Sequence, residues 1–189
     1  KEELLSNIYN WVNKNIKYVA FEYGYAGFIP RLPSEVIQKR YGDCKDMSVL
    51  LYKLCQLANI KCYPSWIGTQ DLPYTYEENP TGYVDNHMIL IAEINDSLFA
   101  LDATAQFLHY TLPSKMIQGK EALMAIDSFQ YKIYKIPIVS AEENMIEDST
   151  VFEVDANGII GKTKIKLCGY SSFDFISSYS YADKSTIHE

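Results

Sequence analysis

Three residues whose side chains can cooperate in nucleophilic catalysis occur along the chain in the order Cys44, His87 and Asp102. A thiolate is a strong nucleophile, an imidazole can exchange protons with it, and a carboxylate holds the imidazole in one tautomer and stabilises its protonated form. Taken singly, each residue type has an ordinary structural role as a small core side chain, a satisfied histidine or a turn aspartate. The catalytic hypothesis therefore depends on a fold that gathers all three.

Cys44 differs from the other cysteines in its place on an expected helix. Apolar residues recur at helical spacing from residue 47 to 58, and Cys44 extends this stripe back into the first helical turn. Backbone amides and the helix dipole at that end favour a thiolate over a thiol. Gly42 permits a tight turn and the close approach of a substrate backbone. We expect Cys55 and Cys62 to be core residues and assign no role to Cys168.

The pattern of strands predicts how His87 and Asp102 meet. Residues 87–94 form a nearly continuous apolar run, a turn follows, and residues 98–102 return as the second strand of a hairpin. If residues 95 and 96 are the two loop residues, the numbers of paired residues add up to 191. Asp102 then opposes Ile89 and lies one diagonal step from His87 on the same face.

Other hairpin registers lead to other outcomes. A loop at residues 96–97 would keep the two side chains on one face but farther apart, and a three-residue loop would place them on opposite faces. Contact between Cys44 and His87 does not follow from the spacing. It requires the cysteine-bearing end of the helix to pack against the first residues of the strand that starts at His87.

The remaining segments complete an expectation of mixed helices and strands. The spacing predicts a helix ending near Asn15, a short helix over 35–39 capped by Ser34, and a short helix over 120–126. It also predicts a strand over 60–68 and a hairpin of residues 151–154 and 159–167 around an Asp-Ala-Asn-Gly turn. Residues 69–84 are expected to form a long loop, which is either a rim over the site or a solvated surface loop.

Composition excludes several classes of function. The 189 residues carry 24 acidic and 17 basic side chains, a net charge of −7, which disfavours binding to nucleic acids and to anionic membrane surfaces. No apolar run approaches the roughly 18 residues of a transmembrane helix, so no membrane insertion is expected. The histidines are scattered and no cysteines are spaced as a CxxC pair, so we expect neither a metal nor a cofactor.

Composition shifts near residue 128 and divides the chain. We expect a core domain over 1–127 and a β-rich extension over 128–189, the latter as the truncated start of a next domain. The chain begins without a methionine, so we expect it to be a piece of a longer protein with domains upstream and downstream.

Three motifs resemble those of the transglutaminase-like superfamily, in its bacterial branch with an upstream domain of unknown function. Residues 41–51 are similar to the family's cysteine motif, 85–89 to its histidine motif and 101–104 to its Asp-x-Thr motif. Residues 9–18 also resemble the family's leading helix, so the resemblance covers about 4–126. One motif alone would be weak evidence, but three in the same order are specific.

The resemblance implies an α+β fold with a papain-like core, in which N-terminal helices pack on an antiparallel sheet, followed by the C-terminal β extension. It implies Cys44 as nucleophile, His87 as general base and acid, and Asp102 as the orienting carboxylate. The chain departs from the family after the histidine motif, where Met88 and Ile89 stand in place of an aromatic residue. The backbone amide of Cys44 would supply one oxyanion donor; we look for a second in the Tyr23–Phe28 loop or near Tyr41.

The leading hypothesis is cysteine-dependent acyl transfer or hydrolysis on amide bonds of proteins or peptides through a thioester, with hydrolysis favoured. A noncatalytic protein- or peptide-binding module on the same scaffold is the alternative, and an interaction platform on the C-terminal strands is a third. The resemblance suggests the bacterial cell envelope or periplasm and leaves the cytoplasm open. The substrate and the oligomeric state do not follow from the sequence.

Overall fold

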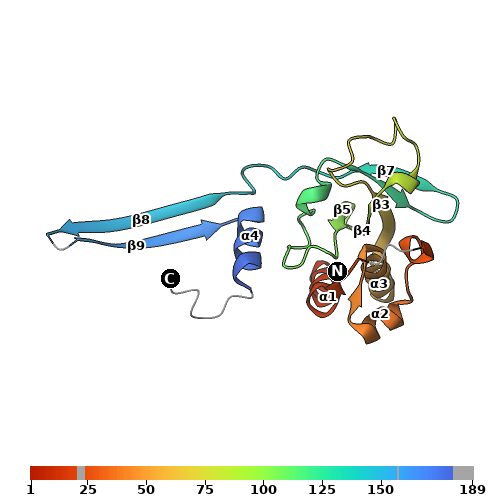
Figure 1. The fold of residues 1–189 in the computed structure, drawn as a ribbon, viewed down its shortest axis with the longest axis horizontal. Coiled ribbons are helices and arrows are strands. Elements are labelled where there is room, and N and C mark those ends of the chain that lie inside the picture. The colour runs from red at the N-terminus through yellow and green to blue at the C-terminus, as the bar shows by residue number, and fades with distance from the viewer. Residues whose placement is uncertain (21–23, 157, 181–189) are drawn as a thin grey trace. The chain divides into compact units, whose positions relative to one another are not determined.

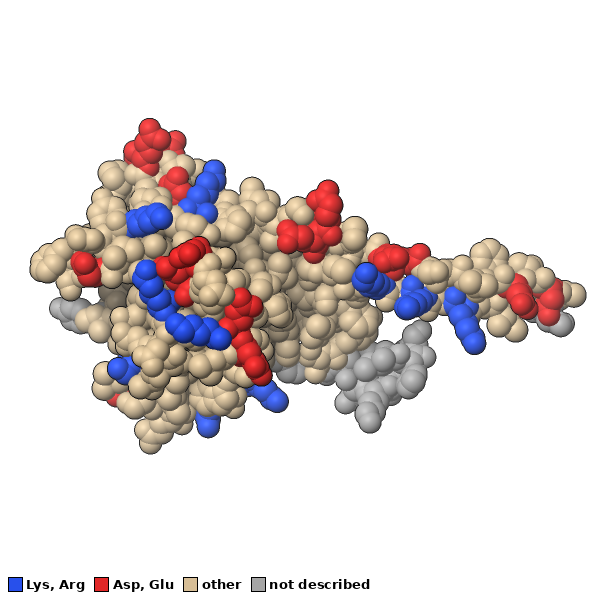
Figure 2. Space-filling model, turned by 180° about the vertical axis from the view of Figure 1, so that it is seen from behind, with Lys and Arg blue, Asp and Glu red and all other residues tan. Residues whose placement is uncertain are grey.

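The computed structural model describes residues 1–20, 24–156 and 158–180, which fold into two compact units. The first unit spans Lys1–Ile138 and the second spans Val139–Glu189. The predicted boundary at 127/128 therefore falls inside the first unit. Basic and acidic side chains lie interspersed on the face shown in Figure 2, consistent with the low net charge per residue.

The first unit combines three helices with an antiparallel sheet, which is an α+β fold (Figure 1). Its helices are α1 (Glu2–Asn15), α2 (Pro33–Lys39) and α3 (Cys44–Leu57). The sheet has the order β5-β4-β3-β6-β7. The bounds are β3 (Lys61–Ile67), β4 (His87–Ile94), β5 (Ser97–Leu101), β6 (Glu121–Ala125) and β7 (Tyr131–Lys135).

Short elements connect these larger ones. A parallel pair of β1 (Lys17–Tyr18) and β2 (Tyr41–Gly42) joins the end of α1 to the start of α3. Three short 3₁₀ helices cover Gly24–Gly27, Gly82–Val84 and Lys115–Ile117. No helix in the described part of the chain is long and apolar enough to cross a membrane.

Two apolar clusters cover the two faces of the sheet. The first joins the buried stripes of α1 and α3 to β4 and β5, and includes Leu5, Tyr9, Val12, Met47, Leu50, Leu51, Cys55, Leu90, Ala92 and Leu101. The second lies on the other face and includes Tyr63, Ile67, Ile89, Ile91, Ile117, Ala122, Met124 and Ile136. Strand β4 is therefore buried on both faces, as its continuous apolar run predicts. Cys55 and Cys62 pack in the first cluster, which confirms their expected place in the core.

Two predictions of local structure were wrong. Residues 121–125 form strand β6, not a helix, because they pair with β3 on one side and β7 on the other. Ala122 and Met124 point into the core while Leu123 lies on the opposite face, and five residues are too few to separate this alternation from helical spacing. Helix α2 begins at Pro33 with Leu32 as its N-cap, because proline is preorganised for the first turn, so Ser34 is not the cap.

The second unit is a long hairpin followed by a helix. Strands β8 (Ile146–Asp155) and β9 (Gly158–Leu167) pair antiparallel around the predicted turn, in which Asn157 lies outside the described residues. Helix α4 (Gly169–Tyr179) follows and was not anticipated. That this unit starts a further domain stays a prediction.

Candidate active site

Cys44 is the first residue of α3, where a capping box fixes the geometry. The Asp43 carboxylate accepts a hydrogen bond from the Asp46 amide at 3.0 Å, and the Asp46 carboxylate accepts one from the Asp43 amide at 3.1 Å. This reciprocal arrangement holds the helix start in one conformation. The amide of Cys44 is among those at a helix start that have no partner within the helix, and its side chain is 7% exposed.

Charged groups hold the start of α3 to the segment before α2. Arg31 donates from its backbone amide and its guanidinium to the carboxylate of Asp46, with the shortest contact at 2.7 Å. Burial raises the pKa of Asp46, but the bonds from Arg31 and Asp43 outweigh burial and lower it. Lys45, which is almost fully buried, pairs with Asp43 at 2.6 Å. The nucleophile candidate therefore rests on a fixed support.

His87 is the first residue of β4 and lies next to Cys44. One turn beyond Cys44, the Ser48 hydroxyl donates to the Met88 carbonyl at 2.9 Å and so ties α3 to the start of β4. The Cys44 thiol lies close enough to the His87 ring to help raise the pKa of the imidazole. The helix end therefore packs against the strand start, which the residue spacing alone could not establish.

Asp102 follows β5 and faces His87 from the adjacent strand. The observed register pairs Ile94 with Ser97 and Leu90 with Leu101, which confirms the predicted hairpin. The carboxylate Oδ1 lies 3.1 Å from Nε2 of His87. The N–H bond of Nε2 does not point at this oxygen. The two groups therefore form an ion pair without a linear hydrogen bond.

A network of donors holds the fully buried Asp102. Its Oδ1 accepts from the Thr104 amide at 3.1 Å and from the Thr104 hydroxyl at 2.7 Å, and its Oδ2 accepts from Ser114 at 2.5 Å. The Tyr9 hydroxyl donates to the Asp102 carbonyl at 2.9 Å. Neither Ser114 nor Tyr9 was predicted from the sequence as a supporting residue. Ser114 has no spacing signal in its loop, whereas Tyr9 stands in the motif that resembles the family's leading helix.

Burial and charge act in opposite directions on the His87–Asp102 pair. Burial lowers the pKa of His87, but the negative charge of Asp102, helped by Cys44, outweighs it and raises the pKa to about 10. Burial raises the pKa of Asp102, but His87, Ser114 and Thr104 together lower it below its usual value. At neutral pH the pair is therefore imidazolium and carboxylate.

A family model described as a transglutaminase-like domain matches residues 1–125. The chain belongs to the transglutaminase-like family. A comparison with curated proteins gave no match.

Two solved structures are similar to this transglutaminase-like chain. One is a candidate cysteine protease from Cytophaga hutchinsonii, with 16% identity, a TM-score of 0.42 and coverage of 86% of this chain and 43% of that one. The other is arylamine N-acetyltransferase C from Bacillus anthracis, with 15% identity, a TM-score of 0.39 and coverage of 96% and 92%. The chain spans less than half the length of the first. These likenesses are too distant to carry an argument about activity.

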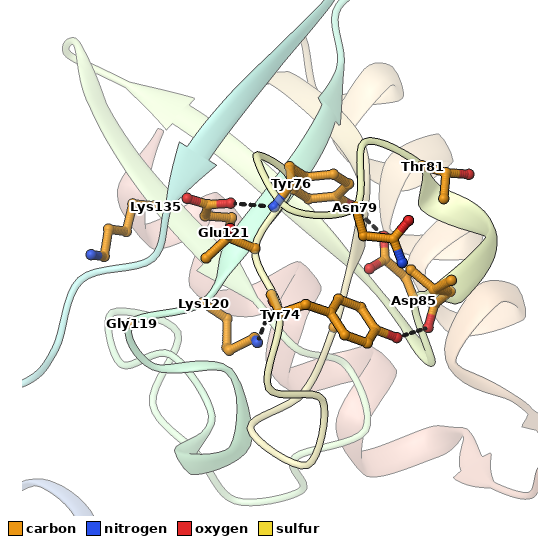
Figure 3. Close-up of a pocket in the computed structure, with 12 residues that line it drawn as sticks. Tyr74, Tyr76, Asn79, Thr81, Asp85, Gly119, Lys120, Glu121 and Lys135 are labelled. Carbon is orange, nitrogen blue, oxygen red and sulfur yellow. Dashed lines mark hydrogen bonds between the residues drawn. The ribbon is translucent and has the colours of Figure 1, made fainter.

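The loop at residues 69–84 of the transglutaminase-like domain is held by several hydrogen bonds (Figure 3). Lys120 donates to the carbonyls of Leu72 and Tyr74, at 2.5 and 3.2 Å. The Tyr76 amide donates to Glu121 at 2.8 Å, and its hydroxyl bonds the carboxylate of Asp85, two residues before His87. The loop is therefore an ordered wall near the start of β4.

The second oxyanion donor of the transglutaminase-like domain stays a prediction. Part of the expected loop, residues 21–23, lies outside the described residues. Near Tyr41, the backbone carbonyl accepts from Arg31 at 2.9 Å, which supports the helix start but provides no donor. Within residues 1–20, 24–156 and 158–180, no group of acidic, histidine and cysteine side chains is arranged to hold a metal ion.

Proposed function

We propose that this transglutaminase-like domain is a cysteine-dependent acyltransferase or hydrolase that acts on amide bonds of proteins or peptides through a thioester. The observation that supports the proposal is the placement of His87, whose pKa is raised by the nearby Cys44 thiol and whose ring lies 3.1 Å from the carboxylate of Asp102. In this proposal Cys44 is the nucleophile, His87 the general acid and base, and Asp102 the orienting carboxylate.

In the first step, the Cys44 thiolate attacks the carbonyl carbon of an amide. A C–S bond forms, and the backbone amide of Cys44 stabilises the oxyanion. His87 then gives its proton to the departing nitrogen as the C–N bond breaks, leaving a thioester and a free amine. The charge of Asp102 stabilises the imidazolium before this transfer and holds the ring in position.

In the second step, water or an amine attacks the thioester while the neutral His87 ring accepts a proton from the attacking group, and the C–S bond breaks to return the Cys44 thiolate. Water gives hydrolysis or deamidation, and an amine gives a crosslink. We favour hydrolysis, because transfer requires both a bound amine and the exclusion of water. We also propose that the domain acts within a longer chain in the bacterial cell envelope, as the family resemblance implies.

Alkylation with iodoacetamide tests the nucleophile. At about pH 6 an ordinary cysteine is almost entirely the unreactive thiol. We expect native protein at this pH to be labelled at Cys44 ahead of Cys55, Cys62 and Cys168, as shown by peptide mapping. His87→Gln should slow labelling at Cys44, whereas His109→Gln, an exposed histidine away from the site, should not. Labelling spread evenly over the cysteines would contradict the proposal.

A noncatalytic peptide-binding module is the second candidate, and the small exposure of Cys44 favours it. The Cys44→Ala variant separates the two functions. An enzyme loses turnover and keeps ligand binding, whereas a binding module has no turnover to lose.

A further inference from the structure

One part of the sheet is left uncovered on the face where α3 packs. Strand pairing places Trp66 opposite Leu123, and Leu123 opposite Ile133, so the three share one face of β3, β6 and β7. Leu90 lies on the same face two strand positions away, since it pairs with Pro64, and it is fully buried beneath α3. The helix therefore covers this face over β4 and leaves it open toward β7.

The open part of this face is hollowed into an apolar groove. A first hollow of about 460 Å³ is lined by Trp66, Leu123, Phe129, Tyr131 and Ile133, among others. Phe129 is 95% exposed and Tyr131 is 70% exposed. Such aromatic exposure is unusual unless a partner covers the rings. We call this hollow and its continuation the aromatic groove.

The aromatic groove continues across Trp66 into a second hollow of about 320 Å³. The second hollow shares Trp66, Thr81 and Gly82 with the first, and adds Phe28, Tyr83 and Asp85. The rings of Phe28 and Tyr83 meet edge to face with centroids 6.5 Å apart. The bonds of Tyr76 to Glu121 and Asp85 hold the adjoining wall in place (Figure 3). The groove is thus largely preformed.

The aromatic groove adjoins residues that are close in the chain to His87. Trp66 pairs with Met88 across strands β3 and β4. Met88 directly follows His87 in the chain. The Met88 carbonyl accepts the hydrogen bond from Ser48, one helical turn from Cys44. Asp85, in the wall of the second hollow, precedes His87 by two residues. The second hollow of the groove therefore lies beside the segment that leads into β4.

We propose that the aromatic groove binds the acyl-donor polypeptide and selects donors with large apolar or aromatic side chains near the reacting amide. This inference rests on the proposed function, because it assigns the groove to the donor of that reaction. The rings and aliphatic side chains of the lining favour such groups by burial and ring contacts. Asp127 lines the first hollow and Asp85 lines the second, so a neutral or basic donor fits better than an acidic one.

Fluorescence of a single tryptophan tests the groove directly. Trp66 and Trp11 are the only tryptophans of the chain, so the Trp11→Phe variant reports from Trp66 alone. The probes are a blocked heptapeptide with phenylalanine at alternate positions and a matched peptide with serine there. We expect the phenylalanine peptide to shift the Trp66 emission and to slow iodoacetamide labelling of Cys44. It should bind at least about tenfold more tightly than the serine peptide.

Matched leucine variants separate the groove from general effects on folding. Leu123→Ser, inside the groove, should weaken binding of the phenylalanine peptide about tenfold. Leu57→Ser, at the exposed end of α3, should leave binding unchanged. Leu57→Ser should also keep the wild-type rate of Cys44 labelling without peptide, because Leu57 lies at the opposite end of α3 from Cys44.

The outcomes separate failure of the proposed function from failure of the inference about the groove. If iodoacetamide does not prefer Cys44 even without peptide, the proposed function fails. If Cys44 is labelled first but the two peptides bind alike, or Leu123→Ser behaves like Leu57→Ser, the groove inference fails and the proposed function stands. Binding that shifts Trp66 emission without protecting Cys44 also overturns the inference, because the bound chain would not lead to the thiol.

Discussion

At the level of single residues, the proposed chemistry depends on the buried carboxylate of Asp102. Asp102 is fully buried, and His87 beside it is 4% exposed, so their interaction is little screened by solvent. The carboxylate is satisfied by Thr104 and Ser114 as well as by the ring. This arrangement costs the desolvation of two groups and is kept stable by those bonds. Because the charge of Asp102 raises the pKa of His87 to about 10, the ring is protonated at neutral pH before the reaction starts.

Removing the charge while keeping the shape should impair catalysis. In Asp102→Asn, burial is no longer opposed by a carboxylate, so the pKa of His87 should fall and the ring should become neutral at pH 7. We expect turnover to fall by roughly 10³–10⁴. The ring titration can be followed by NMR and the rate by an ester substrate. Asp148→Asn, on an exposed strand, is the matched control and should change neither quantity.

The raised pKa of His87 also makes stability depend on pH. Because the folded value of about 10 exceeds the unfolded value, the ion pair contributes fully below about pH 6.5 and is lost as pH rises through about 10. The difference in unfolding free energy between wild type and His87→Gln, on the order of a few kcal/mol, should therefore shrink between about pH 7 and pH 10. Denaturant unfolding at several pH values measures it. A difference independent of pH would contradict the assigned charge state.

At the scale of elements, the site exists because a helix start meets a strand start. The sequence predicted each element correctly, since the stripe of α3 and the apolar run of β4 have clear periods. It predicted the β4–β5 hairpin and left three registers open, and the observed register is the one with residues 95 and 96 in the loop. It could not predict how α3 docks on β4, because tertiary packing leaves no trace in spacing. Ser114 was missed for the same reason.

The bond from Ser48 to Met88 should prove important for this docking. Ser48→Ala leaves the buried carbonyl of Met88 without this donor, so we expect a loss of about 1–2 kcal/mol in unfolding free energy. Cys44 labelling should slow as well, because the thiol and the ring are no longer held together. Ser6→Ala, on the outer side of α1, should leave both unchanged. Loss of stability with an unchanged labelling rate would mean that the bond does not position the site.

At the scale of the whole molecule, the chemistry belongs to the first unit. Both core clusters, the three candidate catalytic residues and the aromatic groove lie within residues 1–138. The predicted boundary at 127/128 lies before the end of this unit, because β7 follows the change in composition but pairs with β6 at the edge of the sheet. The composition changes near residue 128, but the pairing of β7 with β6 extends the first unit to Ile138.

A shortened chain tests this division. We expect residues 1–138 alone to fold cooperatively and to keep the labelling rate of Cys44 within about twofold, because the core clusters are complete without the second unit. A chain ending at residue 127 lacks β7 and should unfold more readily, since Ile136 and the partner strand of β6 are removed. Equal stability of the two chains, by thermal unfolding, would refute the boundary at 138.

The most direct test of the central claim is to look for the acyl-enzyme. Protein mixed with p-nitrophenyl acetate and quenched early is analysed by mass spectrometry with peptide mapping. The account predicts one acetyl group on Cys44, formed more slowly in His87→Gln and absent in Cys44→Ala. Acetylation spread over lysines and all cysteines, at a rate unchanged by His87→Gln, would show that the gathered thiol, imidazole and carboxylate do not act together.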